Sequence, residues 1–179
     1  LPFPVHARGK VREMYDVGAS LATTISRVFP LKAGKVQGLK HIIEPELVYT
    51  YIPQVDQDDN PYFDEEDRVP RMNEVRWILT NYVIGKEVSE DGRVTYPEYG
   101  YLKLSQGYDF SPHLYEEQRE HLSNFAAEAR FSPVRWLSGT MDLEYNPHRS
   151  RLDVFNAGIT VKDKRGDHLD AEYRLSKRY

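Results

Sequence analysis

The acidic stretch between Asp56 and Asp67 is the part of this sequence most suggestive of a chemical site, because it could hold calcium. Asp56, Asp58 and Asn60 match the first three ligand positions of an EF-hand loop. Pro61 then stands where that loop needs glycine for its sharp turn, and Asp67 stands where a bidentate glutamate is expected. We therefore interpret the stretch as a solvated connection between strands, and no metal site is predicted.

Histidines and paired carboxylates are the other candidates for chemistry. Two carboxylate pairs could suggest a glycosidase, Asp142 with Glu144 and Asp170 with Glu172, but each carboxylate alternates with an apolar residue, as on the solvated side of a strand. The sequence has no Gly-x-Ser-x-Gly elbow and no phosphate-binding glycine loop. The histidines lack metal-ligand spacing; they are His6, His41, His113, His121, His148 and His168. We predict no enzyme activity, no metal and no cofactor.

Composition excludes several further classes of protein. The chain has 179 residues, a formal net charge of −4 and no cysteine, which excludes thiol catalysis, zinc–thiolate sites and disulfides. Its pI of about 5.9 argues against nucleic acid as a partner. The longest apolar run is three residues, such as Trp77–Leu79, whereas a spanning helix needs about 20. A transmembrane helix is excluded, whereas strands that cross a membrane are not.

Residues alternate between apolar and polar in the second half of the chain. Phe125, Ala127, Ala129 and Phe131 share one face of a strand, because successive side chains point to opposite sides. The same period recurs over 137–146, 155–161 and 169–176, with a hairpin loop at 163–167. We place the break between the first two of these strands at Ser132–Pro133.

Earlier segments are also read as extended, although their alternation is less regular. These segments are 10–17, 21–29, 36–52, 73–88 and 93–110. The whole chain then has about nine strands, longer than is usual in globular proteins. The segment 112–122 has helical propensity but few apolar residues, so we interpret it as a loop. The predicted fold class is all-β, an antiparallel up-and-down meander.

Two environments produce such alternation: a soluble sheet with one face on a core, and a membrane barrel with a lipid face and a lumen face. Small residues in the apolar rows, such as Ala129 and Gly139, favour lipid over a packed core. The predicted lumen-facing residues are Glu128, Arg130, Asp142, Glu144, Asp170, Glu172 and Arg174. The predicted lipid-facing residues are Phe125, Phe131, Leu137, Leu143, Phe155, Ile159, Val161, Leu169 and Leu175.

The most distinctive motif runs from Glu44 to Asp64. It consists of Glu-Pro, then Tyr-x-Tyr-x-Pro, then Asp-Gln, then Pro-x-Phe-Asp, carried by Glu44, Pro45, Tyr49, Tyr51, Pro53, Asp56, Gln57, Pro61, Phe63 and Asp64. This string, with Lys40-His41 before it and Leu104–Tyr108 after it, resembles the barrel domain of the LptD family of lipopolysaccharide-assembly proteins, also called organic solvent tolerance proteins.

The resemblance implies a location and a set of partners. It implies a non-enzymatic conduit in the outer membrane of Gram-negative bacteria, which assembles lipopolysaccharide into the outer leaflet during envelope biogenesis. The implied partners are lipopolysaccharide, an LptE-like lipoprotein plug in the lumen, and periplasmic bridge proteins that act through a separate N-terminal domain. Residues 1–179 are then one segment of a larger barrel.

Two alternatives remain open from the sequence. The chain could be a complete small outer-membrane barrel for adhesion or envelope stability, which would suit its length and the terminal aromatic Tyr179. It could also be a soluble β-module that binds carbohydrate or lipid.

Overall fold

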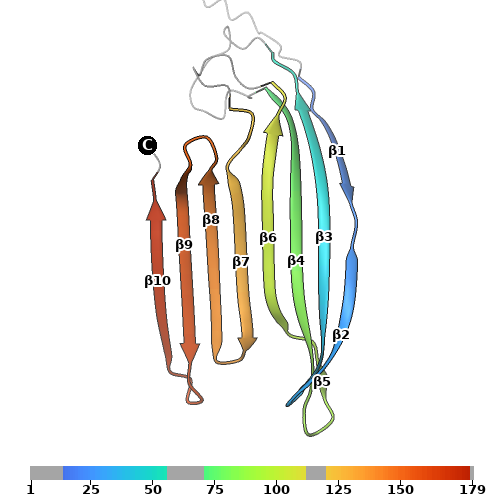
Figure 1. Cartoon of the computed structure of the whole chain (residues 1–179), viewed down its shortest axis with the longest axis vertical. Coiled ribbons are helices and arrows are strands. Elements are labelled where there is room, and N and C mark those ends of the chain that lie inside the picture. Colours follow the sequence, from blue (N-terminus) through green and yellow to red (C-terminus); the bar gives the residue numbers. More distant parts are fainter. Residues whose placement is uncertain (1–13, 56–70, 112–119, 178–179) are drawn as a thin grey trace, which may run out of the picture.

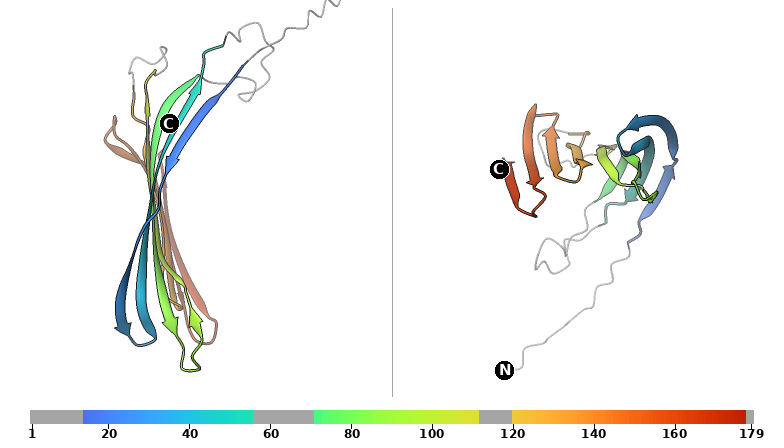
Figure 2. Two further views of the ribbon diagram at one scale, coloured as in Figure 1. Left: turned by 90° about the vertical axis from the view of Figure 1, so that its right-hand side faces the viewer. Right: turned by 90° about the horizontal axis from the view of Figure 1, so that it is seen from below.

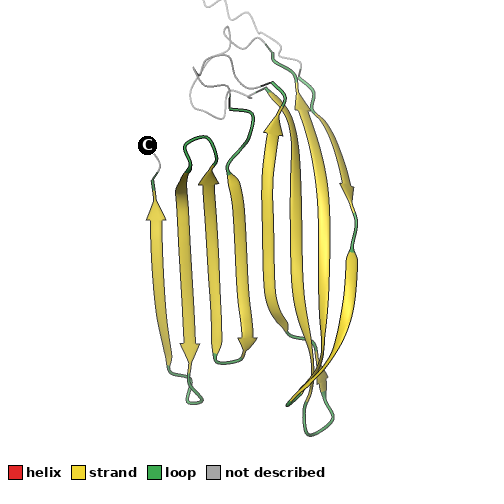
Figure 3. Ribbon diagram, viewed as in Figure 1, coloured by secondary structure: helices red, strands yellow, loops and turns green. Residues whose placement is uncertain are grey.

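In a computed structural model, one antiparallel sheet of ten strands contains nearly all the regular structure of residues 14–55, 71–111 and 120–177, the part of the chain that the structure describes (Figure 1). The strands are β1 (Val17–Ala22), β2 (Ile25–Ala33), β3 (Val36–Ile52), β4 (Met72–Val88), β5 (Val94–Thr95), β6 (Glu98–Asp109), β7 (Phe125–Val134), β8 (Leu137–Asn146), β9 (Arg151–Lys162) and β10 (His168–Ser176). In these three ranges no helix is drawn (Figure 3), and none could therefore cross a membrane.

The strands follow one another across the sheet in an up-and-down order. From β3 onward each long strand pairs with the next long strand, β3 with β4, then β6, β7, β8, β9 and β10, while β5 extends the β4–β6 hairpin. Short turns join several neighbours, and Gly34 and Gly166 provide the positive φ that two of these turns require. The predicted all-β, antiparallel up-and-down fold is therefore confirmed.

The sheet is twisted and open. Seen from below it follows a curved path from β10 to the N-terminal strands, and the two ends of that path lie apart (Figure 2). Among the described strands β10 pairs with β9, and β1 and β2 pair with β3, so both edges of the sheet lack a second partner. Unpaired edges expose a row of backbone N–H and C=O groups that can pair with further strands.

β1 and β2 form one edge strand, interrupted opposite Pro45. Their pairing with β3 keeps a single register, from Ala22 opposite Glu46 to Ile25 opposite Ile43. Thr23 N–H donates to the Pro45 carbonyl at 3.2 Å, but proline has no N–H to return that bond. On its other side β3 pairs with β4 without a shift at this level. Pro45 therefore weakens only the ladder toward the edge.

Several sequence-predicted boundaries are corrected. The segment 21–29 falls across two strands, and 93–110 contains the short β5 as well as β6. Residues 14–16 of the expected strand 10–17 are not in a strand, and 10–13 lie outside the described residues. The expected break at Ser132–Pro133 is wrong, because β7 continues to Val134 with an irregular register at Pro133. A bulge tolerates proline, which explains the difference.

The described sheet has almost no core. Ala127 is its one buried hydrophobic residue, whereas Leu21, Leu169 and Tyr173 are each more than half exposed. A sandwich or a soluble barrel would bury such side chains against a second layer. The described residues supply no second layer, so the apolar side chains of this sheet need lipid or another protein to cover them.

Candidate functional site: a wall with one polar and one apolar face

A row of polar residues crosses the sheet from edge to edge. Through successive pairings, Glu128 of β7 lies opposite Asp142 of β8 and Lys103 of β6. The row continues through register partners that share the same side: Glu44, Thr80, Lys103, Glu128, Asp142, Asn156 and Arg174. Directly opposite residues of antiparallel strands lie on one face. We call this side the polar face.

The polar face carries all seven residues predicted to face a lumen. Register places Glu128, Asp142 and Arg174 in the row just described, and the neighbouring rows hold the others: Arg130, Glu172, Glu144 and Asp170. The register thus places these residues of β7, β8 and β10 on one side of the sheet. What this side contacts stays a prediction.

Ion pairs on the polar face join residues of the same strand. Arg174 contacts Glu172 at 2.7 Å, Arg76 contacts Glu74 at 2.8 Å, and Arg130 contacts Glu128 at 3.7 Å. Across strands the charges opposite Glu128 differ in sign: Lys103 of β6 is its opposite charge, whereas Asp142 of β8 is a like charge. Each arginine therefore neutralises the glutamate two residues before it in its own strand.

Aromatic rings and a hydroxyl add to the contacts of this face. The Arg130 guanidinium lies 4.1 Å from the centre of the Tyr101 ring, and that ring contacts Tyr82 at 5.5 Å. Thr160 donates a hydrogen bond of 2.6 Å to Asp170. Arg130 is thereby held against both a carboxylate and an aromatic face, which fixes the position of its charge.

The opposite side carries all nine residues predicted to face lipid. Leu143 lies opposite Phe155 and Phe155 opposite Leu175, and neighbouring rows hold Phe125, Phe131, Leu137, Ile159, Val161 and Leu169. Ile159 and Leu169 are 43% and 73% exposed. We call this side the apolar face. No described residue covers it, and contact with lipid stays a prediction.

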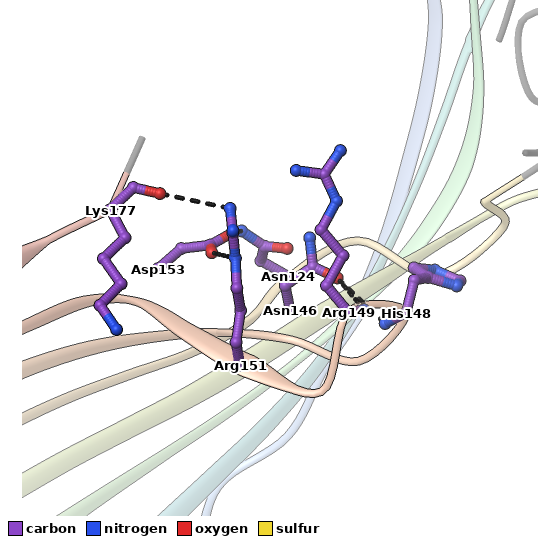
Figure 4. Close-up of polar contacts among 7 residues, drawn as sticks. All are labelled: Asn124, Asn146, His148, Arg149, Arg151, Asp153 and Lys177. Atoms are coloured by element: carbon purple, nitrogen blue, oxygen red, sulfur yellow. Dashed lines mark hydrogen bonds and ion pairs between the residues drawn. The ribbon is translucent and has the colours of Figure 1, made fainter. Parts of the chain in front are cut away.

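Polar contacts link the upper ends of β7 to β10 (Figure 4). Arg151 donates to Asp153 at 2.7 Å and to the Lys177 carbonyl at 3.3 Å, while Asn124 donates to Asp153 at 3.4 Å. The Asn146 side chain accepts hydrogen bonds from the two backbone N–H groups of His148 and Arg149, each at 3.0 Å. These contacts join β9 to the residues that flank β7 and β10 and hold the β8–β9 turn, and the Arg149 side chain points away from them (Figure 4).

A second cluster forms at the lower end, level with the turns. Glu87 is 7% exposed; its carboxylate contacts Lys35 at 2.7 Å and accepts a hydrogen bond of 2.7 Å from the Tyr99 hydroxyl. Lys35 belongs to the β2–β3 turn, so the cluster lies at the turn end of the strands and not in their central part. The hydrogen bonds from Lys35 and Tyr99 lower the pKa of Glu87, while burial and then the Glu87 hydrogen bond raise the pKa of Tyr99 to about 12.

Sequence reasoning missed this lower cluster. Its three members come from two hairpins, Lys35 from β2–β3 and both Glu87 and Tyr99 from β4–β6, and none of them has a spacing that signals a contact. The one clue was Gly85 inside a long strand, because a strand glycine often marks a close approach. The Tyr99 ring lies where a side chain at Gly85 would stand.

The family motif is only partly within the described residues. Tyr49 donates a hydrogen bond of 3.0 Å to Asn73 and so links β3 to β4, while Tyr51 contacts the Tyr15 ring at 6.4 Å, just before β1. Glu44 accepts a bond of 3.5 Å from Thr24. Pro53 follows β3 outside any strand. The remaining motif residues lie outside the described residues, as does the acidic stretch that could hold calcium: Asp56, Gln57, Pro61, Phe63 and Asp64.

Within the described ranges, no group of three histidine, aspartate or glutamate side chains lies close enough together to hold a metal ion. Of the histidines predicted not to bind metal, His168 contacts Asp170 at 3.4 Å, and His148 and His121 contact backbone carbonyls. His6 and His113 lie outside the described residues.

A single antiparallel up-and-down sheet, polar on one face and apolar on the other, defines the class: an all-β wall of the kind from which barrels are built. A family model, LptD: LPS transport system D, matches residues 7–178, and the chain belongs to that family. No curated protein matches the chain. LptD is a transport family rather than an enzyme family, and its members are outer-membrane proteins, so membership assigns the chain to lipopolysaccharide transport.

Proposed function

We propose that the sheet forms part of the wall of an outer-membrane translocon that assembles lipopolysaccharide into the outer leaflet. The polar row that crosses the sheet carries this proposal, because the other face is apolar at nearly every level. A hydrated wall accommodates sugars, and an apolar exterior accommodates acyl chains. The polar face then lines the lumen, the apolar face contacts lipid, and no enzymatic step is involved.

The chain acts, in this proposal, as one segment of a larger barrel in the bacterial outer membrane. Both edges of the described sheet lack a second partner, which suits continuation into further strands. An LptE-like lipoprotein in the lumen and periplasmic bridge proteins are the proposed partners. The 179-residue chain should associate or require detergent in size-exclusion chromatography with light scattering, and a detergent-free monomer would contradict the segment assignment.

Charge reversal on the polar face tests the lumen assignment. Changing Arg130 and Arg174 to glutamate in the full-length protein leaves Glu128 and Glu172 without their neutralising partners. We expect lipopolysaccharide export to fall while the barrel still assembles. Reversal of both Lys164 and Arg165, exposed residues of the β9–β10 turn, is the matched control, since it makes the same change of net charge away from the face.

A charge swap separates a specific contact from bulk charge. Exchanging Glu128 and Arg130 within β7 keeps the net charge and the ion pair but moves the arginine off the Tyr101 ring. If the position of the guanidinium matters, the swap impairs export as the reversal does. Normal export by the double reversal, with normal assembly, contradicts the proposed lining.

A further inference from the structure

Away from its two ends, the apolar face over β2, β3 and β4 is interrupted by three polar side chains. Arg27 of β2 lies directly opposite His41 of β3, and His41 Nε2 donates to Asn81 Oδ1 of β4 at 3.2 Å. On the same face β7 to β10 carry no charged residue in the described register. We call this group the Arg27 cluster.

Arg27 has no carboxylate partner among the described residues. Its side chain is exposed, and its guanidinium lies 5.2 Å from the centre of the Phe29 ring. Phe29 is two residues closer to the β2–β3 turn, so the side chain runs along the strand toward that turn. Long basic side chains take this course when their stem lies in an apolar layer and their charge reaches for a polar one.

The position of Arg27 along the strands agrees with a side chain that runs toward the turn. On the apolar face of β4 the span from Val75 to Gly85 covers the roughly 9–11 residues that a strand needs to cross a bilayer. Arg27 is level with Val83, inside that span, but the Phe29 ring that its guanidinium contacts is level with Gly85 and the Tyr99 ring. The charge therefore lies at the aromatic lower end of the face, where membrane interfaces place such rings.

We propose that the Arg27 cluster binds the phosphate of an anionic phospholipid headgroup in the leaflet at the lower, short-turn end of the sheet. A guanidinium offers paired donors that match phosphate oxygens. His41, directly opposite Arg27, is engaged by Asn81, so the guanidinium is the group of the cluster that reaches the phosphate. Short turns mark the periplasmic side of transmembrane barrels, which sets the leaflet. This inference rests on the proposed function, since it requires the apolar face to contact lipid.

Lipid binding to the full-length protein tests the inference. Native mass spectrometry in detergent would count bound phosphatidylglycerol against phosphatidylcholine with the same acyl chains. We expect the wild type to prefer phosphatidylglycerol and Arg27→Gln to reduce that preference about fivefold, the effect of one basic group near an anionic surface. Arg27→Lys should retain much of the preference, and Arg165→Gln, an exposed turn variant, should retain all of it.

Three outcomes would overturn the inference: equal binding of the two lipids by the wild type, an unchanged preference in Arg27→Gln, or full displacement of the lipid by excess inorganic phosphate. The last would show a site for free phosphate. A fluorophore on Ile159→Cys, quenched by brominated lipid, tests lipid contact of the apolar face separately. Quenching without an effect of Arg27→Gln contradicts only this inference, whereas absence of quenching contradicts the proposed function.

Discussion

Replacing Gly85 with alanine should destabilise the lower end of the sheet by about 2–3 kcal/mol. The new Cβ would stand inside the space of the Tyr99 ring, so the ring must move. Overpacking of this kind costs about 1–3 kcal/mol. The displaced ring also loses its 2.7 Å hydrogen bond to the Glu87 carboxylate, and a bond to a charged group contributes about 1.5–3 kcal/mol. The two effects overlap because one ring movement relieves the overpacking and breaks the bond.

A matched variant lies on the neighbouring strand. A Cβ at Gly100 would meet Val83 at 3.8 Å, an ordinary contact, so Gly100→Ala should cost less than about 0.5 kcal/mol. Urea unfolding of the full-length protein in lipid vesicles measures both variants. Tyr99→Phe lacks the hydrogen bond from the start, so adding Gly85→Ala to it should cost only the overpacking part. Equal stability of the two glycine variants would refute the reasoning.

Three further predictions follow from the same contacts. The pKa of Glu87 lies below its usual 4.5, so its stabilising contribution is present above pH 4.5 and is lost as the pH falls through the lowered value; Glu87→Gln should remove this part of the acid dependence of urea unfolding. Arginine at Ala157, midway along the apolar face, should lower the unfolding free energy by about 2–4 kcal/mol, whereas arginine at neighbouring Asn156 on the polar face should cost less than about 1 kcal/mol; equal effects would contradict the assignment of the faces. Asn146→Ala removes the side-chain oxygen that accepts two hydrogen bonds in the β8–β9 turn and should destabilise the turn by about 1 kcal/mol, seen as faster amide exchange at His148 and Arg149.

Alternation predicted β7 to β10 closely because each strand there has one consistently apolar side. Phe125 to Phe131 and Phe155 to Val161 alternate without exception on that side, and a period of two fixes both strand and face. The polar and apolar faces, with all their predicted members, could therefore be assigned from sequence. The face on which a residue lies follows from the alternation of residues within its own strand, so it can be predicted without knowing which strands pair.

The first half of the sheet was less predictable for a physical reason. Ile42 and Ile78 lie on the polar face of β3 and β4, while His41 and Asn81 lie on the apolar face, so neither strand alternates cleanly. Contacts between residues far apart in the sequence could not be predicted either, because nothing in the order of residues brings Lys35 to Glu87. Such contacts depend on register, which the three-dimensional pairing of strands sets.

Pro45 gives the edge of the sheet a mechanical property. Because β3 lacks one N–H toward Thr23 but keeps its ladder with β4, the edge strand is divided into two hydrogen-bonded halves, β1 and β2, joined at Thr23–Thr24. A force along this edge would detach the strand in two steps, with the joint acting as a hinge. The rest of the sheet would keep its hydrogen bonds, because the interruption at Pro45 does not extend to the ladder between β3 and β4.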